Sequence, residues 1–349
     1  MRNGIAGPLD YATSEGAVKM NDQVYTLGID MGGTKILAAV INGEGQILSR
    51  AKNKTRAELG QEAVVERIVE TANEALATAQ LDPGQIECLG IGAPGPLNPA
   101  SGVILEAPNL KWKNVPLKSI LEDKLGIESH LCNDVNAGAW GEYKRGAAEG
   151  TRSCVGVFVG TGIGGGVVIG GKLWEGANHI AGEIGHMCID PKGPVCGCGR
   201  RGCMEAFSSR TAMTREVREA LKGDKKARKQ LGDEGVQIRS KQFKLAFESG
   251  DKVFVKVIKN GAKQLGIGLG SVANLLNPEC FVLGGGLVEA LGKPYLDLVV
   301  EAFRRQAFES AQTGVRIVEA ALGDDAGVIG AALLARQARA GLEVAASGV

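Results

Sequence analysis

The sequence has almost no net charge. Its 40 Lys and Arg residues are balanced by 39 Asp and Glu residues, which leaves a formal charge of +1 over 349 residues. This balance gives no electrostatic reason to expect a nucleic acid or an anionic membrane as the main partner. The sequence also contains no run of the roughly 18 to 20 apolar residues that a membrane-spanning helix needs. We therefore expect neither nucleic acid nor membrane among the partners.

The N-terminal segment lacks two features. Residues 1–23 are polar and do not contain the apolar core of a secretory signal peptide. They are also shorter than a helix-turn-helix and show neither a helical apolar period nor a basic recognition helix. We expect residues 1–23 to form a flexible arm.

Cysteine is scarce, with eight residues, and histidine is scarcer, with three. Half of the cysteines stand in apolar, strand-like segments, which favours a reducing compartment over a disulfide framework. We therefore expect a cytoplasmic protein. Four cysteines and one histidine are, however, concentrated in a single stretch, GHMCIDPKGPVCGCGRRGCME, from Gly185 to Glu205.

Glycine is abundant, with 52 residues that stand in clusters. Clustered glycine in a folded chain marks tight turns or backbone that approaches a ligand closely. The length of the chain suggests about two domains.

One pattern of strands and glycine turns occurs twice. Apolar runs predict strands over Val24–Ile29 and Ile36–Ile41 on either side of the turn DMGGTK, and a third strand over Gln46–Lys52 after the turn NGEG. From Ser153 the same order returns in CVGVFVGTGIGGGVVIGG. The repetition predicts a duplicated architecture.

The other segments alternate between helix and strand. Charge in the segment Arg215–Asp251 is typical of solvated surface helices. Apolar periodicity and turn signals predict further elements: helices over Gln61–Ala79, Pro116–Leu125 and Val253–Leu276, strands over Ile86–Ile91 and CFVLGGGL, a loop over GAPGPLNPASG, and a closing helix within GDDAGVIGAALLARQARA.

Three glycine clusters are candidate phosphate loops: Asp30–Lys35, Gly160–Gly166 and Gly284–Gly286. The second matches G-x-G-x-x-G, but a strand-like segment follows it where a dinucleotide site needs a helix. The first fails as a P-loop because its Thr-Lys order is reversed. A glycine hairpin still presents backbone N–H groups to an anion, although each cluster by itself is equally well explained as a tight turn. Asp30, at a strand end beside such a turn, is suited to hold Mg²⁺.

The motifs DMGGTK, GAPGP, CNDVNAGAWGE, GTGIGGG, EIGHMCIDPKGPVCGCGRRGCME and VLGGG resemble, in this order, those of the ROK family of sugar kinases and related repressors. The resemblance extends from about Val24 to Ala340, and within the family it points to the bacterial glucokinases. It implies an α/β, two-domain, actin-like (ribonuclease H-like) ATPase fold with an interdomain cleft. The expected division is a small domain 24–132, completed by the C-terminal helix at about 325–345, and a large domain 133–324 that carries a zinc-binding loop.

The resemblance also implies roles for single residues. Asp134 matches the catalytic aspartate, which accepts the proton of the attacking sugar hydroxyl; without the surrounding motif, an Asn-Asp pair before a helix is better explained as an N-cap. The implied sugar-binding residues are Asn109, Asn133, Glu183, His186 and Glu205. The implied nucleotide-binding residues, which serve ATP with Mg²⁺, are Gly32, Gly33, Thr34, Lys35, Thr161, Gly162, Gly164, Gly284, Gly285 and Gly286. Asp30 joins this set through the position described above.

His186, Cys196, Cys198 and Cys203 have the spacing H-x9-C-x-C-x4-C. One histidine and three thiolates form a closed tetrahedral zinc set, which is structural because it leaves no ligand position for water. A redox dithiol and inert buried thiols are the alternatives. Cys188 lies outside the pattern and is expected to be a free thiol. Only one nitrogen of His186 can bind the metal, and the resemblance assigns the other to the sugar.

The expected reaction is the ATP-dependent phosphorylation of a hexose, D-glucose to glucose 6-phosphate, by a homodimer or homotetramer. The sequence leaves open mannose, fructose, allose, N-acetylmannosamine and N-acetylglucosamine as substrates, and polyphosphate or ADP as donors. A sugar-responsive repressor is the alternative from another class; the short N-terminal segment argues against it.

Overall fold

The computed structural model describes residues 24–224 and 237–347. The predicted arm 1–23 and the centre of the charged segment 215–251 lie outside the described residues. No helix within the described residues is both long enough and apolar enough to cross a membrane.

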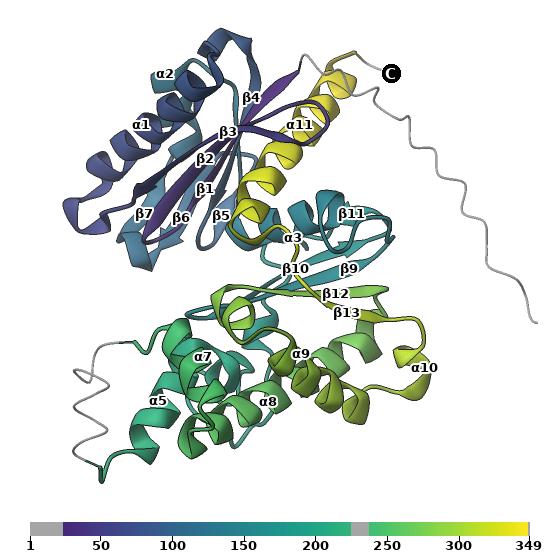
Figure 1. The fold of residues 1–349 in the computed structure, drawn as a ribbon. Helices are drawn as coiled ribbons and strands as arrows, with labels where there is room; N and C mark the ends of the chain where they lie inside the picture. Colours follow the sequence, from purple (N-terminus) through teal and green to yellow (C-terminus); the bar gives the residue numbers. More distant parts are fainter. Residues whose placement is uncertain (1–23, 225–236, 348–349) are drawn as a thin grey trace, which may run out of the picture.

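Two five-stranded sheets with the same plan form the frame (Figure 1). In each, an antiparallel hairpin is followed, next to its first strand, by strands that run parallel to it. This confirms the predicted duplication. The first sheet has the order β3 (Ile47–Lys54), β2 (Lys35–Ile41), β1 (Tyr25–Met31), β4 (Ile86–Ala93), β8 (Ser129–Asn133); the second has β11 (Lys172–Leu173), β10 (Ile163–Ile169), β9 (Cys154–Val159), β12 (Cys280–Gly284), β13 (Arg316–Glu319).

A small third sheet was not predicted. It consists of β5 (Leu97–Asn98), β6 (Val103–Ala107) and β7 (Trp112–Val115), and β5 lies within the segment that the sequence predicts as a loop. Strands of two to five residues are too short to show a two-residue period above the turn residues around them.

Helices cover the outer faces of both sheets and fill the space between them (Figure 1). The first sheet packs its apolar core against α1 (Gln61–Ala79) and α2 (Leu117–Leu125), and the second against α8 (Lys252–Leu276) and α9 (Gly286–Gln306). The bounds of α1 are those predicted. The other α-helices among the described residues are α3 (Asp134–Arg145), α4 (Glu205–Ser208), α5 (Arg210–Ala220), α7 (Ser240–Glu248), α10 (Glu309–Gln312) and α11 (Ala326–Ser347).

The C-terminal helix α11 returns to the first sheet and crosses α3 at backbone contact. A Cβ atom on Gly28 of β1 would overlap the carbonyl oxygen of Val328, and one on Gly330 of α11 would overlap the carbonyl oxygen of Ala137. Glycine is therefore required here for close approach rather than for backbone freedom. Because β8 leads directly into α3, this crossing also places the start of α3 between the two sheets.

The α3–α11 crossing gives a stability prediction. Gly330→Ala is expected to destabilise the protein by about 1–3 kcal/mol, because the added methyl group has no room beside Ala137. Gly341→Ala, in the same helix but facing open space, is the matched control and is expected to stabilise by up to about 1 kcal/mol through helix propensity. Thermal unfolding of the two variants measures this; equal shifts in Tm would contradict the packing argument.

Candidate active site

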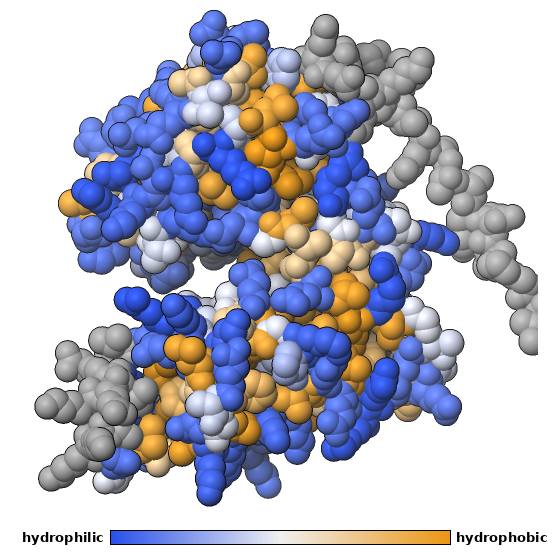
Figure 2. All heavy atoms as spheres, viewed as in Figure 1, coloured by the Kyte–Doolittle hydropathy of each residue, from blue (hydrophilic) through white to orange (hydrophobic). Residues whose placement is uncertain are grey.

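A cavity of about 510 Å³ opens where strands of both sheets end. Figure 2 shows the molecular surface hollowed between the two halves. The structure gathers at this cavity the expected catalytic residue and all five expected sugar-binding residues: Asp134, Asn109, Asn133, Glu183, His186 and Glu205. Of the expected nucleotide-binding residues, Gly162, Gly164 and Gly285 line it and the others do not.

Asn133 and Asp134 stand where β8 turns into α3. The Asn133 side-chain oxygen accepts hydrogen bonds from the backbone N–H groups of Val135 (3.0 Å) and Asn136 (3.1 Å). Asn133 is thus the N-cap of α3, and the capping role that the sequence suggested for the pair does not fall on Asp134. With Oδ1 engaged, Asn133 can offer a ligand only its Nδ2 donor.

Asp134 is half-buried at the first turn of α3. Burial raises the pKa of its carboxyl group, and the negative charge of Glu183 raises it further; the hydrogen bond from the Val135 N–H (2.9 Å) acts in the opposite direction. A carboxylate with a raised pKa is a stronger base than one in water. Asp134 is therefore suited to accept a proton from a group in the cavity.

Glu205 lies in the wall of the cavity. Its Oε2 accepts a hydrogen bond from the Ile163 N–H (2.9 Å), and its Oε1 lies 3.5 Å from Cys196 Sγ. A Cβ on Gly162 would lie 2.5 Å from the Glu205 carboxylate, and one on Gly164 would lie 2.6 Å from the Val135 side chain. These two glycines therefore let β10 approach Glu205 and α3.

The four predicted metal ligands converge beside this wall. The ligand atoms of His186, Cys196, Cys198 and Cys203 all lie within 4.8 Å of one another. Cys198 Sγ and Cys203 Sγ are 3.7 Å apart, as are Cys196 Sγ and His186 Nδ1. Two sulfurs bound tetrahedrally to zinc at about 2.3 Å lie about 3.8 Å apart, whereas disulfide sulfurs lie about 2 Å apart. The donor set fits zinc.

His186 connects this cluster to the cavity. Its Nδ1 faces Cys196, while its Nε2 lies 3.9 Å from Glu183 Oε2. One ring nitrogen is thus directed to the thiols and the other to a carboxylate of the cavity wall. The ring can serve the metal and a ligand at once.

Asp30 lies near the end of β1, next to the start of α11. Burial raises the pKa of its carboxyl group to about 7, and the charge of Asp134 contributes in the same direction. A Cβ on Gly327 would lie 2.9 Å from the Asp30 carboxyl carbon, so this glycine makes room for Asp30. A bound cation would favour the ionised form of this carboxyl.

The first glycine turn is closed by its own backbone and by an ion pair. The Gly32 N–H donates to the Lys35 carbonyl (2.9 Å), and the Thr55 hydroxyl donates to the Gly32 carbonyl (2.6 Å). Lys35 forms an ion pair with Asp324, just before α11. Thr34 is exposed at the tip of the turn.

The second glycine turn is tied to the start of α5. Thr161 Oγ1 accepts a hydrogen bond from Arg210 Nη2 (2.8 Å), and the Gly160 carbonyl accepts one from the Arg210 N–H (2.9 Å). An arginine thus stands beside the expected phosphate loop, a contact that the sequence did not reveal.

The third glycine cluster turns β12 into α9. Gly285 has a positive φ of 87° and precedes the first residue of α9, Gly286; Gly284 packs against Phe158. The start of α9 lies beside the cavity, and α9 is kinked at Gly292, whose φ of 59° is not helical.

Several residues of the site were not assigned from the sequence. Pro94, Gly95 and Pro96 line the cavity; their motif GAPGP contributed to the resemblance without a role. His179 also lines it, with its Nδ1 3.7 Å from Glu175. Histidine is rare in this chain, and that rarity was the only signal that could have indicated His179.

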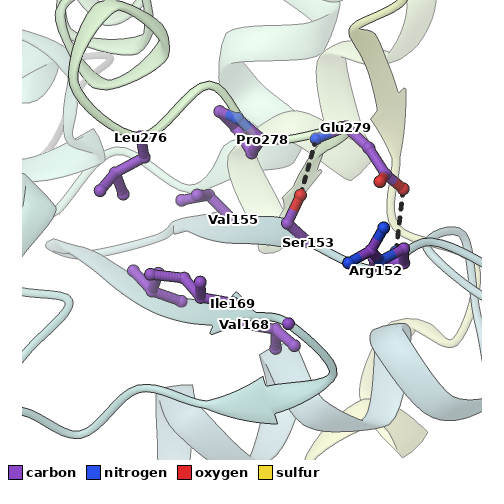
Figure 3. A pocket seen from close by; sticks show the side chains of 10 residues that line it. Arg152, Ser153, Val155, Val168, Ile169, Leu276, Pro278 and Glu279 are labelled. Carbon is purple, nitrogen blue, oxygen red and sulfur yellow. Dashed lines mark hydrogen bonds between the residues drawn. The ribbon is translucent and has the colours of Figure 1, made fainter. Parts of the chain in front are cut away.

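A second cavity of about 280 Å³ lies between β9, β10 and the end of α8. Figure 3 shows its polar rim, where the Glu279 N–H donates to the Ser153 hydroxyl (3.2 Å) and the Arg152 N–H donates to the Glu279 carboxylate (2.8 Å). None of the expected site residues lines it.

Two sheets with the same plan and a cavity where their strands end are typical of the actin-like ATPase fold of sugar kinases, and the comparisons agree. Residues 26–338 match the ROK family, to which this chain belongs. The solved ROK family glucokinase from Streptomyces griseus, in complex with glucose and AMPPNP, is 37% identical, with a TM-score of 0.77 over 90% of this chain and 99% of that chain. The predicted fold class and the sugar kinase activity are thereby confirmed.

Curated relatives include kinases and regulators. A glucokinase from Streptomyces coelicolor is 36% identical over 89% of this chain and 98% of its own length. An N-acetylmannosamine kinase from Escherichia fergusonii is 35% identical over 89% of this chain and 98% of its own length. A xylose repressor from Caldicellulosiruptor bescii is 29% identical over 95% of this chain and 84% of its own length.

Proposed function

We propose that the protein transfers the γ-phosphoryl group of ATP to the 6-hydroxyl of a hexose, with D-glucose as the favoured substrate. The observation that carries the proposal is the half-buried Asp134, whose carboxyl group has a raised pKa, in the same cavity as Asn109, Asn133, Glu183, His186 and Glu205. Asp134 accepts the proton of the hydroxyl while its oxygen attacks the γ-phosphorus and ADP leaves.

Sugar binding follows from the hydrogen-bonding capacity that remains in the cavity. Asn133 offers Nδ2 because its oxygen caps α3, and Glu183 and Glu205 accept from neighbouring hydroxyl groups. His186 offers Nε2 because Nδ1 faces the thiols. Asn133, His186 and Glu205 are half-buried, and a sugar that lacks a hydroxyl matching one of these polar groups is expected to bind less well.

ATP with Mg²⁺ is proposed to lie along the glycine turns. Gly32, Gly33 and Thr34 on one side and Thr161 with Arg210 on the other face the phosphates, and Gly284–Gly286 at the start of α9 face the adenosine side. Asp30, with Lys35 close by, is proposed to hold the cation, which supplies charge neutralisation when bound.

The raised pKa of Asp30 gives a testable consequence. At pH 7 about half of this carboxyl is protonated, since its pKa is about 7, and a bound cation favours its ionised form. Binding of Mg²⁺-ATP is therefore expected to release a fraction of a proton at pH 7 and almost none at pH 8.5. Calorimetry in two buffers of different ionisation enthalpy measures this. In Asp30→Asn the pH-dependent release should be absent; an unchanged release in that variant would remove Asp30 from the proposal.

Zinc is proposed as a structural ion held by His186, Cys196, Cys198 and Cys203. The four ligands are all protein atoms, so a bound ion fixes the loop and the His186 ring and leaves no position for substrate. The gathered ligand atoms support this.

The preference of the protein among the hexoses can be measured directly. N-acetylmannosamine is the specific competitor, because a kinase of that sugar is 35% identical. A coupled assay tests the sugar and the phosphoryl donor together. The sugars are glucose, mannose, fructose, allose, N-acetylmannosamine and N-acetylglucosamine, and each is combined with ATP, ADP or polyphosphate. The highest kcat/KM is expected for glucose with ATP.

A repressor function is the second candidate, supported by the similarity to a xylose repressor. We expect no binding of DNA from the protein's own promoter region in a gel-shift assay.

We also propose a small domain 24–132 completed by α11, a large domain 133–324, assembly as a homodimer or homotetramer, and a cytoplasmic location. The location is supported by the cysteines, all of which are free thiols in the structure.

A further inference from the structure

Cys188 lies two residues after the proposed zinc ligand His186 but is not part of the ligand set. It is exposed, and the four gathered ligand atoms do not include its sulfur. The proposed activity gives it no role. Its position relative to Cys203 nevertheless gives it a specific chemistry.

Cys188 and Cys203 face each other across a short antiparallel bridge. The hydrogen bonds of this bridge lie on either side of the pair: the Ile189 N–H donates to the Gly202 carbonyl (2.8 Å), and the Met204 N–H donates to the Met187 carbonyl (2.9 Å). The two cysteines therefore form a non-hydrogen-bonded pair. The Cα atoms of such a pair lie about 4.5 Å apart, with both side chains on the same face.

This register suits a disulfide. The Cα separations found in disulfides run from about 4.4 to 6.8 Å, so the bond can form with little movement of the backbone. Gly202 permits the close approach of the two segments, since its φ is 74° and a Cβ there would lie 1.7 Å from the Asp190 carbonyl oxygen. The two thiols differ in access, because Cys203 is 1% exposed whereas Cys188 is open to solvent.

We propose that Cys188 and Cys203 are a site of reversible oxidation by peroxides, which form a disulfide between them and withdraw Cys203 from the zinc set. Hydrogen peroxide first converts the Cys188 thiol to a sulfenic acid and releases one water. The Cys203 thiolate then attacks the Cys188 sulfur, the S–S bond forms, and the leaving hydroxide takes a proton to become a second water. Sulfur loses two electrons in all, and the peroxide gains them.

The consequence rests on the proposed zinc site. Withdrawal of Cys203 leaves His186, Cys196 and Cys198, so the affinity for zinc is expected to fall by at least tenfold. Because His186 Nδ1 faces the metal and Nε2 faces the cavity, its ring then loses its fixed orientation. The KM for the hexose is expected to rise, while dithiothreitol restores both zinc binding and KM.

Tryptic cleavage separates the relevant cysteines. Cys188 lies in peptide 173–192, Cys196 and Cys198 in 193–200, and Cys203 in 202–210. The full-length protein is treated with one equivalent of hydrogen peroxide, alkylated and digested. Mass spectrometry is expected to find 173–192 linked to 202–210, and a coloured chelator is expected to detect zinc released in step with this link.

Cys188→Ser is the matched variant, because it removes only the exposed partner. It is expected to keep its zinc and its KM under the same treatment. A link between 193–200 and 202–210 in both proteins, or equal loss of zinc from both, would overturn the proposal. The cross-linked peptide is detected independently of zinc content and kinase activity. A failed kinase assay or a zinc-free protein is therefore distinguishable from a disulfide that does not form.

Discussion

Asp134→Asn is expected to lower kcat by about 10²–10⁴-fold, the usual contribution of a general base, while the Kd for the hexose changes little. Asparagine has nearly the shape of aspartate but cannot take a proton, and it is tolerated in the first turn of α3, where Asn133 keeps the cap. Stopped-time product assays give kcat, and calorimetry with the hexose alone gives Kd.

The control for this variant is Asp297→Asn on α9, which removes an exposed carboxylate that pairs with Lys293. Its kcat is expected to equal that of the wild type. The pH profile adds a second readout: because burial raises the pKa of Asp134, kcat should be full above that pKa and fall as the pH drops through it. Retention of kcat in Asp134→Asn would remove this residue from the reaction.

Removal of the proposed zinc is expected to have the second largest effect. Cys198→Ser should lose the metal and raise the KM for the hexose by about 10- to 100-fold, since groups that orient a metal ligand have effects of this size. The physical reason is His186, whose ring is directed to the cluster by one nitrogen and to Glu183 by the other. Metal analysis and steady-state kinetics measure the two quantities.

Cys188→Ser is the control here, because Cys188 lies in the same stretch but outside the ligand set. It is expected to keep about one zinc per chain, the number that one closed set binds, and an unchanged KM. A wild-type protein that contains no zinc and yet binds hexose normally would contradict the structural role of the cluster.

Much of the two-sheet framework could be predicted from local sequence patterns. Two hairpins with glycine turns predicted the duplicated sheets, and the 3.6-residue apolar period gave α1 with its observed bounds. The residues that line the cavity came from motifs, which place Asp134 and Glu205 without any knowledge of the fold. The sequence did not predict short strands such as β5, because two residues are too few to show a two-residue apolar period.

Contacts between distant segments could not be predicted. Lys35 pairs with Asp324, 289 residues further along the chain, and a charge pattern does not identify so remote a partner. Gly164 illustrates a different limit. The sequence predicts a phosphate loop here, and the structure shows in addition that this glycine accommodates Val135 of α3. A glycine needed for packing and one needed for a ligand look alike in a sequence.

The central claim is that this chain phosphorylates a hexose at its 6-hydroxyl with ATP. The most direct measurement is ³¹P NMR of the purified protein incubated with glucose, ATP and Mg²⁺. We expect the γ-phosphate signal to be replaced by a phosphomonoester signal coupled to the protons on C6 of glucose, with ADP formed in equal amount. ATP that remains intact with every hexose of the panel, or is hydrolysed to free phosphate alone, would contradict the account.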